Sequence, residues 1–93
     1  MGLVRLYATL RAHAGGEGAV EVLWSPGDAV VGVIRELVRL RPGLDGYILD
    51  KEGDLLPFVS VFVDGRDIRH LDGLPTPVGG DAEISVFPPV AGG

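Results

Sequence analysis

The sequence predicts a single α+β domain, in which a mixed sheet of about five strands packs on one main helix and an extended tail follows at the C-terminal end. Three observations support this fold class. Two strand-like pairs are each joined by a turn, one long segment with helical periodicity lies between them, and a last apolar strand runs into prolines and glycines. A chain of 93 residues forms one domain and can bury a core without disulfides.

The first strand pair is predicted from alternating apolar and polar residues over 3–8 (LVRLYA) and 19–24 (AVEVLW). The intervening LRAHAGG segment is interpreted as a turn, so the two strands form a hairpin. One face of the pair is expected to be buried, and its residues are Val4, Leu6, Ala8, Val20, Val22 and Trp24.

The main helix is predicted over residues 29–41, because apolar residues recur there at helical spacing. Ser25 or Asp28 is expected to cap its first turn, and Pro42-Gly43 is expected to end it. Gly32 costs about 1 kcal/mol relative to Ala inside a helix, so close packing on the sheet is expected to compensate. The apolar stripe consists of Val30, Val33, Ile34, Leu37 and Leu40.

The C-terminal half contains the second strand pair and the last strand. Residues 42–57 are rich in Gly, Pro and Asp, and only 47–49 are expected to form a short turn of helix. Residues 58–70 predict a strand, an Asp-Gly turn and a return strand through Ile68. Residues 82–87 predict the last strand. Its inward residues are Ala82, Ile84 and Val86, its outward ones are Glu83, Ser85 and Phe87, and Val59, Val61 and Val63 share a face of the preceding strand.

The predicted order of elements is β-β-α-β-β-β. One mixed sheet across the helix buries these elements most simply, and that arrangement is the β-grasp fold. If the first and last strands are central neighbours, the chain leaves the middle of the sheet. We therefore expect a domain over residues 1–87 and a flexible tail over 88–93.

Composition restricts the chemistry of the chain. It has no cysteine, which excludes disulfides, thiolate metal sites and cysteine nucleophiles. The net charge is −5 and the basic residues are scattered, so nucleic acid is not an expected partner. The apolar stretches are too short to cross a bilayer. We expect a cytoplasmic protein without a metal site or a membrane span.

Residues for autonomous catalysis are also lacking in the sequence. His13 and His70 form no metal-binding pair, and both are expected to be solvated at the surface. Asp50, Glu52 and Asp54 are interpreted as a polar turn, because the segment lacks the length and closing glutamate of a calcium loop. No phosphate-binding glycine motif or nucleophile elbow occurs. The chain is therefore not expected to be an enzyme by itself.

The tail residues suggest a reactive group. Pro88 and Pro89 lack amide hydrogens and end the strand ladder in an extended conformation. From Pro88 to Gly93 the tail can reach about 20 Å, far enough to enter a partner's active site. Gly92 and Gly93 lack Cβ atoms, so they fit a narrow channel and leave the terminal carboxylate open to attack on ATP. An idle terminus is the alternative.

These residues resemble a known family. The ending GDAEISVFPPVAGG is similar to the C-terminus of the ubiquitin-like sulfur carriers, specifically the MoaD-type small subunit of molybdopterin synthase and its ThiS-like relatives. The segments VRLYATLRAHAG and DGRDIRHLDGLPTPVGGD resemble the first strand and the later hairpin of that family, whereas residues 42–57 are least distinctive.

The resemblance implies a sulfur carrier. A ubiquitin-activating-enzyme-like adenylyltransferase would adenylate Gly93 with ATP, and a sulfurtransferase carrying a persulfide would convert it to a thiocarboxylate. The large subunit of molybdopterin synthase would supply the catalytic groups that deliver sulfur to the pterin dithiolene. The chain itself would bind no cofactor.

The resemblance also implies contact residues. Phe87 and Tyr7 match hydrophobic positions that contact partners in the family, and Arg11 matches a polar one. The predicted tail-binding residues are Pro88, Pro89, Val90, Ala91 and Gly92. Ordinary packing on the sheet surface is the alternative for the two aromatic side chains.

Three other functions remain open at this point. The chain can carry sulfur for thiamine, thiolated tRNA or cysteine, because those carriers share the fold and the Gly-Gly ending. It can be a protein modifier that forms isopeptide bonds, with Lys51 as its only lysine. It can also be a β-grasp binding module in which the tail has no role.

Overall fold

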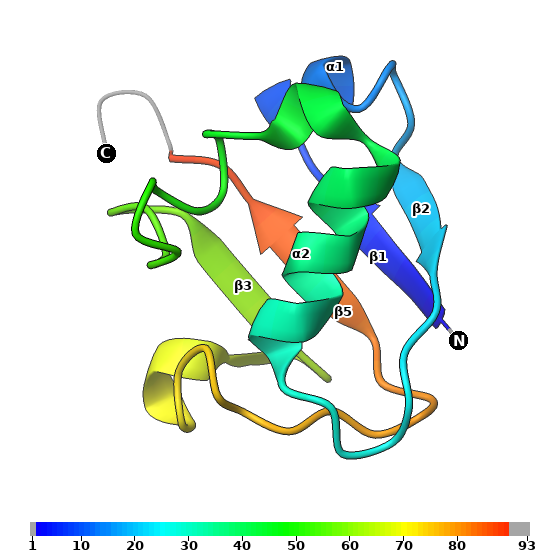
Figure 1. Ribbon diagram of the computed structural model, residues 1–93, viewed down its shortest axis with the longest axis vertical. Coiled ribbons are helices and arrows are strands. Elements are labelled where there is room, and N and C mark those ends of the chain that lie inside the picture. The colour runs from blue at the N-terminus through cyan, green and yellow to red at the C-terminus, as the bar shows by residue number, and fades with distance from the viewer. Residues whose placement is uncertain (1, 90–93) are drawn as a thin grey trace.

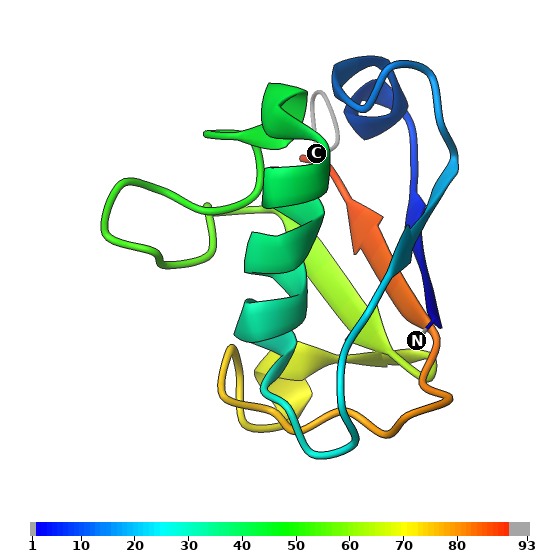
Figure 2. The ribbon, with the colours of Figure 1, turned by 45° about the vertical axis from the view of Figure 1, so that its right-hand side comes forward.

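A computed structural model describes residues 2–89 of the chain. It contains two layers, a five-stranded sheet and the helix α2 that crosses one face of it (Figures 1 and 2). The strand order is β2-β1-β5-β3-β4. In chain order the elements are β1 (Gly2–Leu6), α1 (Thr9–His13), β2 (Ala19–Val22), α2 (Val30–Leu40), the 3₁₀ helix η1 (Pro42–Leu44), β3 (Ser60–Val63), β4 (Arg66–Asp67), the 3₁₀ helix η2 (Ile68–His70) and β5 (Ile84–Phe87).

The first and last strands are parallel neighbours in the middle of the sheet, which meets the condition for the chain to leave the middle of the sheet after β5. Val4 of β1 lies opposite Ile84 of β5, and Leu6 lies opposite Val86. The other three pairings, β1 with β2, β3 with β5 and β3 with β4, are antiparallel. Because β1 and β5 run in the same direction, both end at one end of the sheet (Figure 1).

The core lies between the sheet and α2, and the predicted alternation accounts for it. The strands β1, β2, β3 and β5 each bury every second residue against the helix layer, and α2 contributes one apolar stripe. Trp24 is buried with its indole N–H donated to the Gly79 carbonyl over 2.8 Å. The buried core includes Val4, Leu6, Val20, Val22, Val30, Val33, Ile34, Leu37, Val59, Val61, Val63, Ile84 and Val86.

The segment between the first two strands is a helix, and its prediction as a plain turn is wrong. Leu10 and Ala14 are both buried, four residues apart, so α1 anchors itself on the core. Ala8 precedes α1 with a φ of 53° and is exposed. Its predicted place on the buried face is therefore wrong, because the strand ends at Leu6.

The first turn of α2 is capped by a distant loop, and the predicted side-chain cap by Ser25 or Asp28 is wrong. The Asp28 carboxylate accepts the Ser25 N–H at 2.9 Å, which stabilises the turn before the helix. The N–H of Val30 is donated to the Thr76 carbonyl, and that of Val31 to Leu74. The 74–76 loop thus supplies the acceptors that a helix start lacks.

Gly32 of α2 does not pack closely on the sheet. A Cβ built at this position meets nothing within 4 Å, so the expected compensation for a helical glycine is absent there. The helical turn expected at 47–49 is also wrong. The 3₁₀ turn forms earlier, at η1, where Pro42 occupies the first turn.

The second hairpin contains the predicted Asp-Gly turn at Asp64-Gly65, but its return strand β4 has two residues only and Ile68 begins η2. Beyond β4, the side chain of Arg69 contacts the residue that precedes β3. Its guanidinium donates to the Val59 carbonyl over 2.7 Å. The predicted polar turn at 50–54 is present, because the Asp50 carboxylate accepts the N–H groups of Glu52 and Asp54.

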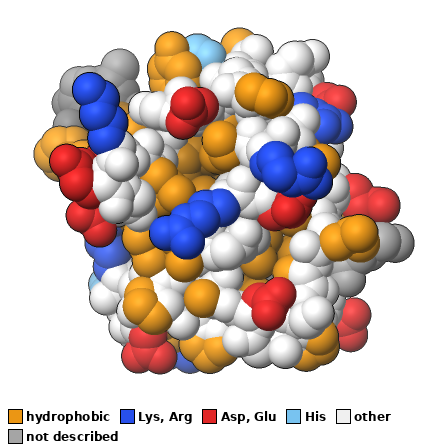
Figure 3. All heavy atoms as spheres, viewed as in Figure 1, with side chains coloured by type: hydrophobic (Ala, Val, Ile, Leu, Met, Phe, Trp, Pro, Cys, Tyr) orange, Lys and Arg blue, Asp and Glu red, His pale blue; other side chains and the backbone are white. Residues whose placement is uncertain are grey.

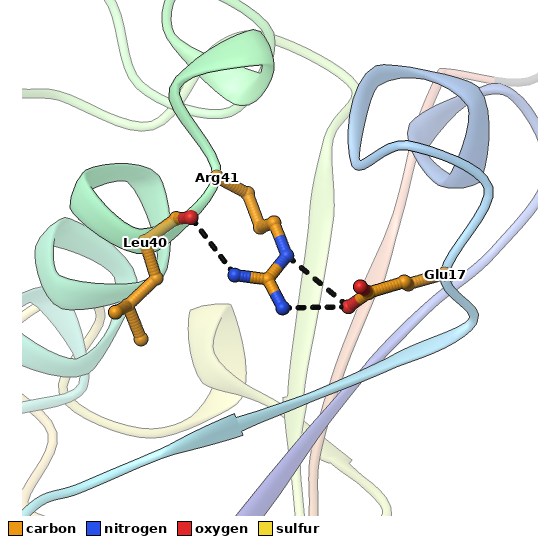
Figure 4. A network of polar contacts seen from close by, with 3 residues as sticks. All are labelled: Glu17, Leu40 and Arg41. Carbon is orange, nitrogen blue, oxygen red and sulfur yellow. Dashed lines mark hydrogen bonds and ion pairs between the residues drawn. The ribbon is translucent and has the colours of Figure 1, made fainter.

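An ion pair joins the end of α2 to the connection between β1 and β2 (Figure 4). Arg41 donates from Nε and Nη2 to one carboxylate oxygen of Glu17, at 3.1 and 2.8 Å. Its Nη1 donates to the Leu40 carbonyl, which occupies one acceptor left free at the helix end. The side chains of Arg41 and Glu17 are 34% and 46% exposed, so we expect this pair to contribute less than about 1 kcal/mol.

Candidate functional site

The base of the tail lies at the end of the central strand β5. Phe87 is the last residue of that strand, Pro88 is buried and Pro89 is exposed. The other predicted tail and carrier residues, Val90, Ala91, Gly92 and Gly93, lie outside the described residues. The division between a domain ending at residue 87 and a tail stays a prediction.

An aromatic cluster surrounds the last residue of β5. The rings of Tyr7 and Phe87 stack with centroids 4.3 Å apart and an interplanar angle of 9°. Phe62 of β3 meets Phe87 edge-on, with centroids 5.4 Å apart and planes at 78°. All three side chains are half-buried. We call Tyr7, Phe62 and Phe87 the sheet-face cluster.

Strand alternation places this cluster on the face opposite α2. Val61 and Val63 point into the core, so Phe62 between them points outward. In the β3–β5 register Phe62 lies opposite Ser85, and Ser60 lies opposite Phe87. Sequence reasoning identified Tyr7 and Phe87 as contact residues but missed Phe62. The alternation that places Val59, Val61 and Val63 inward also predicts that Phe62 points outward.

Arg11 lies at the same end of the sheet but makes its own contact. Its Nε donates to the Leu6 carbonyl over 3.1 Å, which ties α1 to the last residue of β1. Its side chain lies beside Gly18, where a Cβ would approach Arg11 Nε to 3.4 Å. Arg11 is exposed, so a cation is held near the position where β5 ends.

The face opposite α2 remains open among the described residues. Two shallow hollows lie on it, one lined by Phe62, Gly65, Glu83, Ser85 and Phe87 and the other by Gly2, Leu3, Arg5, Asp81, Ala82 and Glu83. On the face that carries α2, basic and acidic side chains are interspersed among apolar ones (Figure 3). The open face thus offers half-buried aromatic rings with polar residues beside them, as protein interfaces do.

A second group of aromatic side chains lies near the base of the tail. His13 of α1 stacks on Tyr47, with centroids 3.6 Å apart, and Tyr47 is 47% exposed. His13 is half-buried by this contact, so its predicted solvated position is only partly correct, whereas His70 is exposed. Phe58, two residues before β3, is 77% exposed and has a φ of 67°. That left-handed backbone costs an L-residue about 1–2 kcal/mol.

Within residues 2–89 no group of three or more His, Asp or Glu side chains is arranged to hold a metal ion. Over the same residues, no helix has the length and apolar character needed to cross a membrane. The reactive group that the sequence predicts, the Gly93 carboxylate, lies outside the described residues.

A family model described as the ThiS family matches residues 4–93. The chain belongs to the ThiS family. It is 39% identical over 92 residues to "Small archaeal modifier protein 3" of Haloferax volcanii, covering 97% of this chain and 96% of that protein. It is 32% identical over 92 residues to "Sulfur carrier protein CysO" of Mycobacterium tuberculosis, with the same shares covered.

Solved structures confirm the ubiquitin-like β-grasp fold of this ThiS-family chain. The Amycolatopsis orientalis BexX/CysO complex contains a chain with a TM-score of 0.86 and 30% identity, and the match covers all of both chains. A putative molybdopterin converting factor subunit 1 from Pyrococcus furiosus has a TM-score of 0.72, covers 96% of this chain and 97% of its own, and is 22% identical. That last likeness shows the fold alone.

Proposed function

We propose that this ThiS-family chain carries sulfur as a thiocarboxylate on Gly93. The observation that carries the proposal is the position of β5. It is the central strand, it is paired on both sides, and it leads directly into the Pro-Pro-Val-Ala-Gly-Gly sequence. A rigid domain thereby presents a short tether with a carboxylate at its end. The relative named a sulfur carrier supports this chemistry.

The proposed reaction uses the chain as substrate of its partners. A Gly93 carboxylate oxygen attacks the α-phosphorus of ATP and releases pyrophosphate, which gives an acyl adenylate. The terminal sulfur of a donor persulfide then displaces AMP to form an acyl disulfide. A second thiol cleaves that disulfide and leaves the thiocarboxylate. ATP is bound by the adenylyltransferase, and the chain holds no cofactor of its own.

We further propose that the sulfur acceptor is the pterin precursor bound to the large subunit of molybdopterin synthase. The FPPVAGG ending supports this assignment by its similarity to the small subunit of that enzyme. The sheet-face cluster and Arg11 would contact the large subunit, because the cluster contains Phe87, the last residue of β5, and Arg11 contacts Leu6, the last residue of the neighbouring β1. Thiamine, thiolated tRNA and cysteine are the competing products.

The test is the intact mass of the protein after incubation with a cognate adenylyltransferase, ATP and a persulfide donor. We expect a mass increase equal to the exchange of one oxygen for sulfur in the wild type. A chain lacking Gly92 and Gly93 should show no increase, and Gly93→Ala should show a sharply reduced one at unchanged stability. Full labelling of the truncated chain would contradict the carrier role.

A second candidate function is protein modification. A relative bears the name modifier, and Lys51 is an exposed primary amine in this chain. The same activated carboxyl group would then react with a lysine amine in place of a persulfide. The two functions share the adenylation step and differ in the nucleophile that follows.

A further inference from the structure

Three further aromatic side chains, of which Tyr47 and Phe58 are exposed and His13 is half-buried, come from segments next to the end of β5. His13 and Tyr47 form a stacked pair, and Phe58 is the third residue. We call these three residues the aromatic rim. They differ from the sheet-face cluster, whose rings contact one another around Phe87.

The positions of the rim residues follow from the topology. α1 begins three residues after the end of β1, which lies beside β5 in parallel, so His13 lies at the end of the sheet where β5 stops. Phe58 precedes β3, whose first residue Ser60 pairs with Phe87, the last residue of β5. In Figures 1 and 2 the end of β5 lies between α1 and the start of β3.

Phe58 is the most informative member of the rim. An aromatic ring normally packs against its own domain, and a left-handed backbone normally belongs to glycine. Phe58 has the ring exposed and the backbone strained at once. The Val59 N–H donates to the Leu56 carbonyl over 3.2 Å, so a turn through Pro57 and Phe58 holds this backbone in place. The ring itself stays exposed, which leaves it available for a contact with another molecule.

The length of the tail limits how far from the domain a molecule that acts on Gly93 can lie. Four residues follow Pro89 in the sequence, and they span at most about 13 Å when fully extended. Any enzyme that acts on the Gly93 carboxyl group must therefore approach Pro89 closely. The surface around Pro89, which includes the rim, is then covered by the wall of that active site.

We propose that the aromatic rim docks on the mouth of the adenylyltransferase and seals it during activation. This inference rests on the proposed sulfur-carrier function. The acyl adenylate is a mixed anhydride that water hydrolyses, so the site that forms it must exclude water while the tail is inside. Phe58 and Tyr47 present exposed rings from segments next to the end of β5, as such a seal requires. The thiocarboxylate product survives in water, so its delivery does not need the same seal.

The experiment measures carrier-dependent pyrophosphate release by the cognate adenylyltransferase with Phe58→Gly and Tyr47→Ala. Glycine adopts the left-handed backbone without strain, so Phe58→Gly removes the ring while the fold keeps or gains stability. Leu23→Ala is the matched control. Leu23 is 71% exposed and lies at the opposite end of the sheet, just after Val22, which pairs with Gly2.

We expect each rim variant to raise the KM for the carrier at least tenfold. The urea midpoint of Phe58→Gly should equal or exceed that of Leu23→Ala within experimental error. Leu23→Ala should keep the wild-type KM. A second measurement uses thiocarboxylate prepared chemically from an intein fusion and sulfide. Rim variants loaded in this way should transfer sulfur to the acceptor at the wild-type rate.

The outcomes separate this inference from the function it rests on. If the wild type is activated and the rim variants have its KM, the rim inference is wrong and the carrier function stands. If the rim variants are activated normally but deliver sulfur slowly, the rim belongs to the acceptor interface and the inference is also wrong. If an adenylyltransferase proven on its own carrier does not activate the wild type, both proposals fail.

Discussion

Phe87 stacks face to face on Tyr7 and meets Phe62 edge-on, so one ring contributes both to the fold and to the exposed surface. Aromatic pairs of this geometry contribute about 0.5–1.5 kcal/mol each beyond the area that they bury. The cluster is therefore partly structural. The proposed contact with a partner depends on the part of each ring that stays accessible.

Phe87→Ala is expected to lower the free energy of unfolding by about 1–2 kcal/mol, because it removes both aromatic contacts. We expect a larger loss in binding to the sulfur-accepting partner, which calorimetric titration measures. Unfolding can be followed by the fluorescence of Trp24, the single tryptophan, which is buried. Leu3→Ala, on the same open face but outside the cluster, is the control. Equal binding by both variants would show that the cluster is ordinary surface packing.

The alternation of residues along the strands predicts part of the candidate site but not the backbone of Phe58. Alternation placed Tyr7 and Phe87 outward, and the structure brings them into contact. It also predicts that Phe62, between Val61 and Val63, points outward, although Phe62 was not identified as a site residue. The backbone of Phe58 was not predicted, because the third position of the turn closed by the Val59 N–H and the Leu56 carbonyl normally favours glycine and here holds an aromatic residue.

At the scale of elements, α2 shows how tertiary contacts replace local ones. Its apolar stripe was predictable from periodicity, because helical spacing decides which residues share a face. The cap of α2 was not predictable, because the N–H groups of Val30 and Val31 donate to carbonyl oxygens more than forty positions later in the chain. The short helix α1 was missed although Leu10 and Ala14 are four residues apart, because the glycines that follow favoured a turn.

Gly32→Ala is expected to stabilise the protein by about 0.5–1 kcal/mol, because alanine is the better helix former and its Cβ meets nothing within 4 Å. Gly43→Ala is the matched comparison. A Cβ at Gly43 would overlap the carbonyl oxygen of His13, so we expect a loss of about 1–3 kcal/mol there. Urea denaturation of the two variants measures both changes. A loss of stability in Gly32→Ala would mean that its surroundings are tighter than described.

The Arg41–Glu17 pair is expected to contribute a coupling energy below about 1 kcal/mol, because both side chains are partly exposed. A double-mutant cycle with Arg41→Ala and Glu17→Ala measures it. The coupling should shrink in 1 M salt, which screens exposed charges over about 3 Å. A coupling that is large and independent of salt would instead indicate that the pair holds α1 and α2 together by geometry.

At the scale of the whole molecule, the single lysine allows the carrier and modifier functions to be distinguished by the conjugates that the chain forms. Lys51 lies in the turn that the Asp50 carboxylate stabilises, and it is exposed. The other seven basic side chains are arginines, whose guanidinium groups do not form isopeptide bonds. Conjugates between copies of this chain through a side chain must therefore use Lys51.

If the chain is also a modifier, Lys51→Arg should abolish side-chain-linked dimers in a mixture with ATP and the adenylyltransferase, as seen by denaturing electrophoresis and peptide mass spectrometry. Thiocarboxylate formation by the same variant should remain at the wild-type level. Dimers that persist in Lys51→Arg would locate the linkage at the N-terminal amine. A complete lack of dimers in the wild type, under conditions that load sulfur, would restrict the chain to the carrier function.

The pairing of β5 on both sides has a mechanical consequence. A partner that grips the tail and pulls on it transmits the load directly into β5. The ladders to β1 and β3 run along that strand, so their hydrogen bonds are strained together in shear and do not open one after another. Tension on the tail is thus borne by the strongest part of the sheet, and the domain can be drawn firmly against an active-site entrance without unravelling from its own C-terminal strand.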